Sequence, residues 1–232
     1  MDHQELQKRF AELTTAHVAD ACRRTQIPVR TVSLTPVLPG RLAGRVLPAR
    51  HVGSVDIFLE AFGSAEPGDV LVVDNGGRRD EACVGDLMAL EAQAAGISGL
   101  VVWGLHRDTV DIRAIGLPVY SLGSLPTGPL RLDSLPPDAL EFANVGEWTV
   151  TTADVVLGDD DGVVFVPADR AAELFDLAES IRDKERRQAE RIRSGTSLRE
   201  QVLFDAFLAG RAQRPSLTFR EHLREVSGAI EE

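Results

Sequence analysis

Three short apolar runs separated by helix-forming segments constrain the fold of this chain more than any other feature of its sequence. The runs are Val70–Val73, Leu100–Trp103 and Val119–Ser121, and the segments between them include Gly85–Ala95 and Asp108–Ile115. Continuous apolar runs of this length are typical of strands that are buried on both faces of a parallel sheet. The alternating order therefore predicts a βαβαβ unit with parallel strands and right-handed crossovers.

Further elements are predicted around this unit. Helices are expected at Gln4–Leu13, His17–Arg24 and Ser54–Phe62. Strands are expected at Val32–Leu38, at Val46–Val52 and within Leu140–Val166, where Asp159–Gly162 predicts a hairpin turn. A long helix is expected at Pro167–Ser194, with Pro167 in its first turn, and short helices at Leu198–Leu208 and Phe219–Val226. We therefore expect one α/β domain, residues 1–195, and a C-terminal helical arm, residues 196–232.

The composition excludes several classes of protein. The 232 residues carry a formal net charge of −11, which is unfavourable for binding a nucleic-acid backbone. No apolar run approaches the roughly 20 residues of a membrane-spanning helix, and the first residues do not resemble a secretory signal. Cys22 and Cys83 are too few for a disulfide framework or a thiolate zinc site. We expect a soluble, cytoplasmic protein that binds neither nucleic acid nor membrane.

The lysine content argues against one type of enzyme mechanism. Lys8 and Lys184 are the only lysines, and both lie in polar segments. Schiff-base catalysis needs a desolvated lysine in a pocket, so imine chemistry is not expected. A phosphate-binding P-loop also needs a lysine, and GxGxxG spacing is absent from the chain.

Two loops that follow neighbouring parallel strands carry the residues best suited to chemistry, because ligands of open α/β sheets bind beyond the carboxyl ends of the strands. The first loop leads to the helix start Gly85-Asp86-Leu87-Met88, whose free backbone N–H groups could hold a carboxylate. A purely structural alternative is that Gly85 ends the loop and Asp86 caps the helix.

The second loop ends in Arg107-Asp108. Asp108 could bind Mg²⁺ or Mn²⁺, which accept carboxylate and water ligands, and Arg107 could stabilise charge on an oxygen that the metal polarises. The alternative is that Asp108 caps a helix and Arg107 is an exposed side chain.

A third candidate lies on the long C-terminal helix. Glu185 falls on the same helical face as Leu174, Ala178, Ile181 and Ile192. A carboxylate among apolar residues is costly unless it is paired or belongs to a site, so Glu185 could enter a pocket of a neighbouring subunit. Equally, the apolar stripe could leave the core before Glu185, which would then be solvated or paired with Arg182 or Arg186.

These motifs resemble those of a class II aldolase family. The spacing Asp86-x20-Arg107-Asp108 is similar to the D-x20-R-D signature of the 4-hydroxy-4-methyl-2-oxoglutarate/4-carboxy-4-hydroxy-2-oxoadipate aldolases, whose fold is shared by the regulator of ribonuclease activity A (RraA). The surrounding segments 67–74, 115–119 and 161–167 also resemble this RraA-like family, and the similarity extends over about residues 13–195. The loop Asn75–Arg79 departs from the family pattern because it contains two arginines, and the arm after Gly195 extends beyond the shorter members.

The resemblance implies an α/β/α sandwich of the swivelling-domain type, assembled as a homotrimer or homohexamer with active sites between subunits. It implies that Asp108 binds Mg²⁺ or Mn²⁺ and that Arg107 contacts the keto oxygen of the substrate. It further implies that the backbone of Gly85, Asp86, Leu87 and Met88 binds the pyruvyl carboxylate, and that Asp86 orients a water. Glu185 is the expected carboxylate from the adjacent subunit.

The expected activity is cleavage of a 4-hydroxy-2-oxo acid to pyruvate and a second oxo acid, with Asp86, Arg107 and Glu185 as the catalytic residues and with oxaloacetate decarboxylation as a side reaction. The main alternative is a non-catalytic RraA-like protein that regulates ribonuclease E through its surface. A small-molecule methyltransferase is not expected, since the chain lacks a nucleotide-binding loop.

Overall fold

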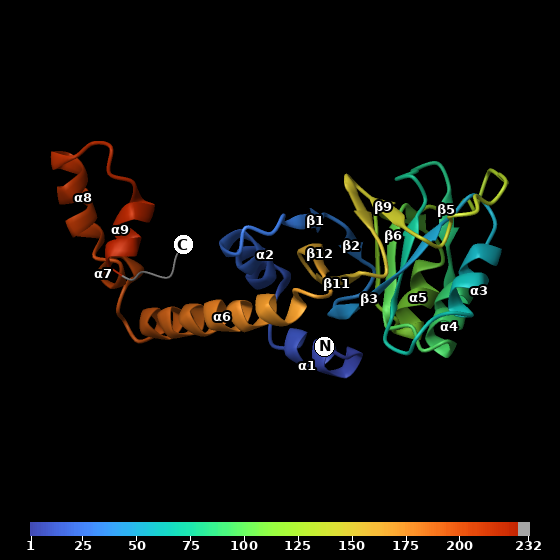
Figure 1. The fold of residues 1–232 in the computed structure, drawn as a ribbon, viewed down its shortest axis with the longest axis horizontal. Helices are drawn as coiled ribbons and strands as arrows, with labels where there is room; N and C mark the ends of the chain where they lie inside the picture. Colours follow the sequence, from blue (N-terminus) through green and yellow to red (C-terminus); the bar gives the residue numbers. More distant parts are fainter. Residues whose placement is uncertain (227–232) are drawn as a thin grey trace.

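The central sheet of the structure has a parallel half and an antiparallel half (Figure 1). In this computed structural model, which describes residues 1–226, the eight strands lie in the order β1-β12-β11-β3-β4-β6-β8-β2. The parallel strands are β3 (Leu42–Arg50), β4 (Val70–Asp74), β6 (Gly99–Trp103) and β8 (Val119–Ser121). The antiparallel strands are β1 (Arg30–Val32), β2 (Thr35–Pro36), β11 (Asp154–Asp159) and β12 (Gly162–Pro167).

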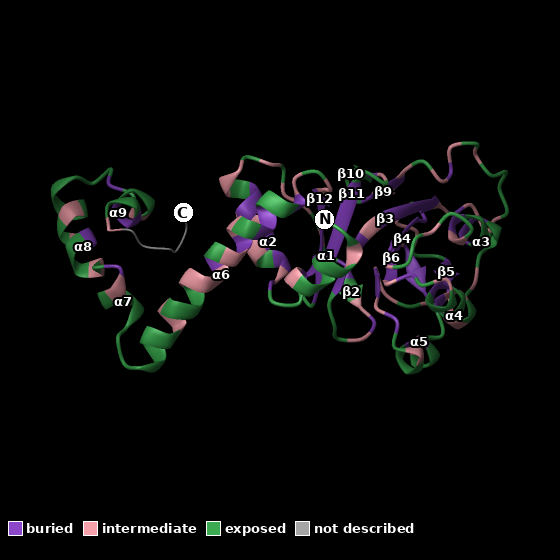
Figure 2. Ribbon diagram, turned by 60° about the horizontal axis from the view of Figure 1, so that its bottom comes forward, coloured by how far each residue is buried: buried purple, intermediate pink, exposed green. Residues whose placement is uncertain are grey.

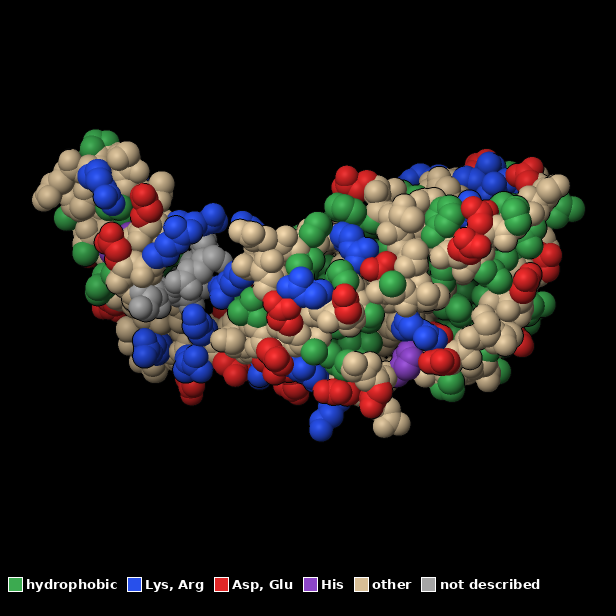
Figure 3. Space-filling view, in the orientation of Figure 1, with side chains coloured by type: hydrophobic (Ala, Val, Ile, Leu, Met, Phe, Trp, Pro, Cys, Tyr) green, Lys and Arg blue, Asp and Glu red, His purple; other side chains and the backbone are tan. Residues whose placement is uncertain are grey.

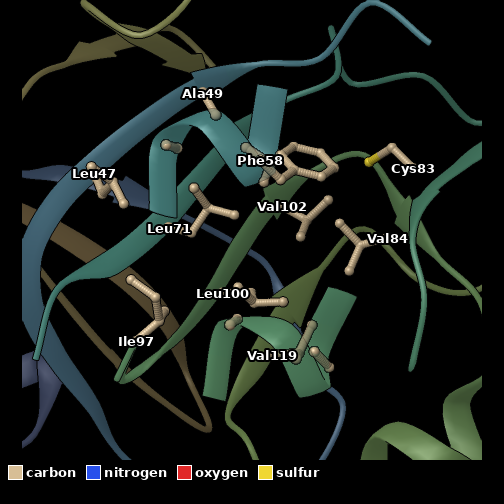
Figure 4. Packing of buried hydrophobic residues seen from close by; sticks show 14 of the residues in the cluster. Leu47, Ala49, Phe58, Leu71, Cys83, Val84, Ile97, Leu100, Val102 and Val119 are labelled. Atoms are coloured by element: carbon tan, nitrogen blue, oxygen red, sulfur yellow. The ribbon is translucent and has the colours of Figure 1, made fainter. Parts of the chain in front are cut away.

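The predicted βαβαβ unit is confirmed, and its helices cover one face of the parallel strands. The unit comprises β4, α4 (Asp86–Ala94), β6, α5 (Thr109–Ile115) and β8, and α3 (Asp56–Phe62) lies beside it. Leu71, Leu100 and Val102 on the strands pack against Phe58 and its neighbours in a fully apolar core (Figure 4). These four named side chains are at most 2% exposed, so this core holds the strand ends that carry the candidate site in fixed positions.

A second group of helices covers the antiparallel half. Helices α1 (His3–Phe10), α2 (Thr15–Arg24) and α6 (Ala171–Arg193) pack on β3, β11 and β12 through residues such as Phe10, Val18 and Phe175. Ala43 in this core and Leu47 in the first core lie on the same face of β3, so the two groups of helices cover different halves of one face of the sheet. The expected α/β fold is confirmed.

The sheet is strongly curled, which explains why the predicted strand Val32–Leu38 is wrong as a single element. β1 pairs with β12 at one end of the strand order and β2 pairs with β8 at the other, although only two residues separate β1 from β2. The two edges therefore come together, and the curl encloses a third apolar cluster that includes Val72, Tyr120 and Phe165. The hairpin β9 (Ala143–Val145) and β10 (Trp148–Val150) contributes Val145 and Val150 to that cluster.

Two predicted helix boundaries are also wrong. Pro167 is the last residue of β12, where it pairs with Asp154, and α6 begins only at Ala171. The predicted helix Leu198–Leu208 is interrupted, because Leu203 adopts a left-handed conformation with φ of 48° and divides it into α7 (Leu198–Gln201) and α8 (Phe204–Gln213). The turn at Asp159–Gly162 joins β11 to β12, as predicted.

The helical arm lies at the far end of α6 (Figure 1). The arm comprises α7, α8 and α9 (Phe219–Glu225). In it, α8 and α9 bring Phe204, Phe207, Phe219 and His222 into an aromatic cluster whose contacting ring centroids are 5.0 to 6.2 Å apart. The outer part of α6 is largely exposed, and a hollow separates the arm from the body (Figures 2 and 3). Residues 227–232 of the predicted arm lie outside the described residues.

Within residues 1–226, no helix is both long enough and apolar enough to cross a membrane. On the face shown in Figure 3, acidic and basic side chains are interspersed.

Candidate functional site

A short ladder between two loops brings the predicted site residues together. β5 (Ala82–Val84) and β7 (Leu105–His106) pair in parallel beyond the main sheet, and the Arg107 N–H donates to the Val84 carbonyl over 2.9 Å. Each strand is followed at once by a predicted site segment, Gly85–Met88 after β5 and Arg107-Asp108 after β7. The ladder therefore places the two segments next to each other.

Gly85 provides the space in which the second segment fits. A Cβ atom built on Gly85 would lie closer than 3.0 Å to Asp108 Oδ2 and 3.3 Å from Arg107 Cγ and Nε. The backbone of Gly85 is extended, with φ of −136°, which any residue can adopt. The requirement for glycine here is therefore steric: the missing side chain lets the Asp108 carboxylate approach the start of α4.

Asp108 does not cap α5, which was the structural alternative for this residue. It occupies the N-cap position, but its side chain makes no capping hydrogen bond, and its backbone is left-handed with φ of 57° and ψ of 40°. Its Oδ2 instead lies 3.3 Å from Arg107 Nε, and the two side chains are 36% and 47% exposed. The carboxylate and the guanidinium are thus accessible side by side.

Asp86 does not cap its helix either. The N-cap of α4 is Gly85, which has no side-chain hydrogen bond to offer, and Asp86 is the first residue of the helix. The N–H groups of the first turn of a helix have no partner within it, and the helix dipole favours an anion there. The start of α4 therefore presents anion-binding groups beside Arg107.

His106 is a residue that sequence reasoning did not single out. The ring is buried between Ser121 Oγ, 2.8 Å from Nδ1, and Thr109 Oγ1, 3.0 Å from Nε2. Burial lowers the pKa of His106 below its ordinary value, which favours the neutral ring. Its place directly before Arg107-Asp108 at the end of a strand was the signal that could have identified it.

A polar network anchors a further loop, residues 127–131, next to the site. Glu81, which is fully buried, accepts the Leu130 N–H and Arg131 Nε, and Arg131 also donates to Asn75 Oδ1. Burial alone would raise the pKa of Glu81, but these hydrogen bonds and the nearby arginines hold it below its usual range. The sequence offered no signal for this network, because its members are distant along the chain.

The anchored loop forms a wall of the site. A Cβ atom on Gly128 would lie 2.8 Å from Arg107 Nη1, so the loop passes directly against the guanidinium. The Ala82 N–H donates to the Thr127 carbonyl over 2.8 Å and fixes the loop to β5.

Glu185 lies away from these residues within one chain. It is on α6, which extends away from α4 and α5 (Figure 1), and its side chain is 49% exposed. The buried stripe of α6 ends at Ile181, and Ile192 is exposed, so the apolar face leaves the core before Glu185. Its partner is neither Arg182 nor Arg186 but His17, whose Nε2 lies 3.1 Å from Glu185 Oε2.

The orientation of the His17 ring follows from its other contact. The Thr14 N–H donates to His17 Nδ1 over 3.0 Å within the capping box of α2. Nδ1 is therefore an acceptor, and the ring proton is at Nε2, where it can be donated to Glu185.

The donor set around Asp108 fits a hard divalent cation that keeps most of its waters. Within residues 1–226, no three His, Cys, Asp or Glu side chains gather into a metal-binding group, which argues against a closed zinc site in this part of the chain. Mg²⁺ and Mn²⁺ can be held through one or two carboxylates together with water and substrate oxygens. The accessible Asp108 carboxylate, with the space left by Gly85 beside it, meets that requirement.

Comparisons with known proteins agree with the fold. The uncharacterized protein MJ0644 of Methanocaldococcus jannaschii is 33% identical over 126 residues, which cover 53% of this chain and 59% of that protein. The chain thus matches less than two thirds of this relative. An uncharacterized protein from Pseudomonas syringae pv. tomato superposes with a TM-score of 0.73 and 26% identity over 85% of this chain and 96% of that chain.

A third similarity carries a functional description. Streptomyces coelicolor RraAS2, described as an unusual member of the RNase ES inhibitor RraA family, superposes with a TM-score of 0.69 and 26% identity over 78% of this chain and 94% of that chain. The family model RraA-like (Aldolase/RraA) matches residues 15–165, well over half of the chain and including both loops of the site. The chain therefore belongs to the RraA-like family, which includes both aldolases and RraA proteins.

Proposed function

We propose that this protein is a divalent-metal-dependent class II aldolase of the cytoplasm. It cleaves a 4-hydroxy-2-oxo acid, of the 4-hydroxy-4-methyl-2-oxoglutarate or 4-carboxy-4-hydroxy-2-oxoadipate type, to pyruvate and a second oxo acid. The single observation that carries the proposal is the accessible pair of Arg107 and Asp108. The two side chains lie beside the start of α4, where the missing side chain of Gly85 leaves room for them.

The residues of the two loops divide the binding of the substrate between them. The backbone N–H groups at Gly85–Met88 bind the C1 carboxylate at the positive end of α4. Arg107 donates to the C2 oxygen and stabilises the negative charge that develops there. Asp108 holds Mg²⁺ or Mn²⁺, which when bound supplies Lewis-acid polarisation to the 2-oxo acid.

Proton transfer accompanies cleavage of the C3–C4 bond. A water oriented by Asp86 takes the proton of the C4 hydroxyl, C4 becomes a carbonyl carbon, and the bonding electrons pass to C3 as the enolate of pyruvate. Return of a proton to C3 completes the reaction. Oxaloacetate gives the same enolate by losing CO₂ from C4, which accounts for the decarboxylase side activity.

A second copy of the chain completes the site in this proposal. Leu87 directly follows Asp86 and Val110 lies two residues after Asp108; they are 70% and 76% exposed, and Leu90 on the same helix as Leu87 is 47% exposed. Apolar side chains grouped around a polar site favour coverage by another protein surface. We propose a homotrimer or homohexamer in which the Glu185 carboxylate of the neighbouring subunit assists proton transfer.

The alternative function is regulation of ribonuclease E without catalysis, which the similarity to RraAS2 favours. The accessible Arg107 and Asp108 favour the enzyme, because a protein that acts only through its surface does not need a cation and a carboxylate placed beside a helix start.

A coupled pyruvate assay distinguishes the two functions. Several 4-hydroxy-2-oxo acids and oxaloacetate are tested with Mg²⁺, with Mn²⁺ and with EDTA. We expect metal-dependent pyruvate release that EDTA abolishes and that the Asp108→Ala variant lacks while its circular dichroism spectrum remains that of the wild type. Unchanged activity of Asp108→Ala would refute the metal assignment, and capture of ribonuclease E without any aldol activity would favour the regulator.

A further inference from the structure

The turn that carries Arg107 and Asp108 has an unfavourable backbone. Asp108 is one of three non-glycine residues with positive φ in the described part of the chain, together with Gln26 and Leu203. Left-handed backbone is disfavoured for most residues with a Cβ atom, less so for aspartate, and an aspartate at the start of a helix ordinarily caps it. Asp108 makes no cap, so its conformation and the direction of its carboxylate, away from α5, depend on other contacts of the turn.

The ring of His106 supplies such a contact. His106 and Thr109 are the first and last residues of the four-residue turn, and a hydrogen bond between His106 Nε2 and Thr109 Oγ1, 3.0 Å, closes it. The other ring nitrogen, Nδ1, bonds to Ser121 Oγ over 2.8 Å, so the turn is fastened to β8 of the main sheet.

The ring is held firmly enough to act in this way. His106 is 5% exposed, and its backbone N–H and carbonyl bond to Gly123 and Leu125. Ser121 Oγ is itself bonded to both the N–H and the carbonyl of Gly123. The Ser121 hydroxyl donates to the Gly123 carbonyl, so it accepts from Nδ1–H of the neutral ring, and Nε2 accepts from the Thr109 hydroxyl.

We propose that His106 is a positioning residue for the metal-binding carboxylate. By joining Ser121 to Thr109 it closes the turn around Arg107-Asp108, keeps Asp108 left-handed and holds its carboxylate beside Gly85 rather than on the N-terminus of α5. This proposal rests on the proposed function, because it assigns the purpose of the turn to binding of Mg²⁺ or Mn²⁺ at Asp108. Groups that orient metal ligands commonly change metal affinity by 10- to 100-fold when they are removed.

The test removes the hydroxyl partner and keeps the ring. Thr109→Val deletes the Oγ1 contact with almost no change of volume, whereas Thr109→Ser retains it. Thr149→Val is the matched control, since Thr149 Oγ1 also makes a side-chain hydrogen bond, 2.9 Å to Asn144, but at an exposed position of the hairpin β9–β10. Binding of Mn²⁺ to each full-length variant is measured by the electron paramagnetic resonance of the free ion, and the crystal structure of Thr109→Val is compared with that of the wild type.

We expect the Mn²⁺ dissociation constant of Thr109→Val to rise about 10-fold or more, while Thr109→Ser and Thr149→Val stay within about 2-fold of the wild type. We also expect Asp108 to leave the left-handed region in Thr109→Val. Wild-type affinity together with an unchanged Asp108 in Thr109→Val would overturn the proposal.

Failure of the proposed function gives a different result. In that case Mn²⁺ does not bind the wild type, or its binding survives Asp108→Asn. The crystal structures then still decide whether the bond between His106 and Thr109 holds the turn, and an unchanged turn in Thr109→Val would refute the positioning role.

Discussion

The steric role of Gly85 gives the sharpest prediction. In Gly85→Ala, the new methyl group would lie closer than 3.0 Å to Asp108 Oδ2, whereas ordinary contacts begin near 3.4 Å. The carboxylate and the Arg107 side chain must therefore move, by a displacement on the order of 1 Å, which in an active site can lower the rate about 100-fold. The fold should tolerate the change, because the φ of −136° suits alanine and the displaced side chains are partly exposed.

The assay compares Gly85→Ala with Gly40→Ala, whose new methyl group would have no atom within 4 Å. We expect pyruvate release by Gly85→Ala to fall between about 10- and 100-fold, with weaker Mn²⁺ binding and a melting temperature within a few degrees of the wild type. Gly40→Ala should keep both activity and affinity. Full activity of Gly85→Ala would refute the argument that the close approach of Asp108 to α4 matters for the reaction.

Three further predictions concern stability and domain organisation. Phe58→Ala removes a ring that is fully buried in the core and stacked on His51, so urea titration should show a free energy of unfolding lower by about 3–5 kcal/mol. Burial lowers the pKa of His51 below 6.5, so the unfolded chain binds more protons than the native one just below that pH. The free energy of unfolding should therefore fall as the pH is lowered from about 7 through 6.5, and fall less in His51→Gln; equal slopes for the two proteins would contradict this. A chain truncated after Gly195 should keep the melting temperature of the body, because the aromatic cluster of the arm packs on itself; loss of folding would place the domain boundary elsewhere.

The sequence allowed the parallel core to be predicted because its signals are local. Val70–Val73 and Leu100–Trp103 are apolar without interruption, and the helices between the strands follow glycine and aspartate residues. The break between Val32 and Thr35 could not be predicted, since it depends on pairing with β12 and β8, more than 80 residues further along the chain at its nearest. Pro167 was misplaced for a related reason: its partner across the ladder, Asp154, determines that it ends a strand.

The candidate site was predictable to the same extent. The positions of Gly85 and Arg107-Asp108 follow from the parallel strand order, which places both segments at one edge of the sheet. The left-handed Asp108 and the bond between His106 and Thr109 were not predictable, because they depend on side-chain conformation within a turn. For Glu185 the helical periodicity was correct, but periodicity alone does not show where a helix leaves the body that it packs on.

The position of the helical arm depends on how the long helix α6 packs on the body. Its 23 residues span about 35 Å, and the buried residues all lie in the half that packs on the body. A tilt of about 10° at that packed end would displace the far end by about 6 Å over this length. The contacts between α2 and α6, including the bond from His17 to Glu185, therefore influence the position of the aromatic cluster. A small shift of α6 at these contacts becomes a larger displacement of the arm.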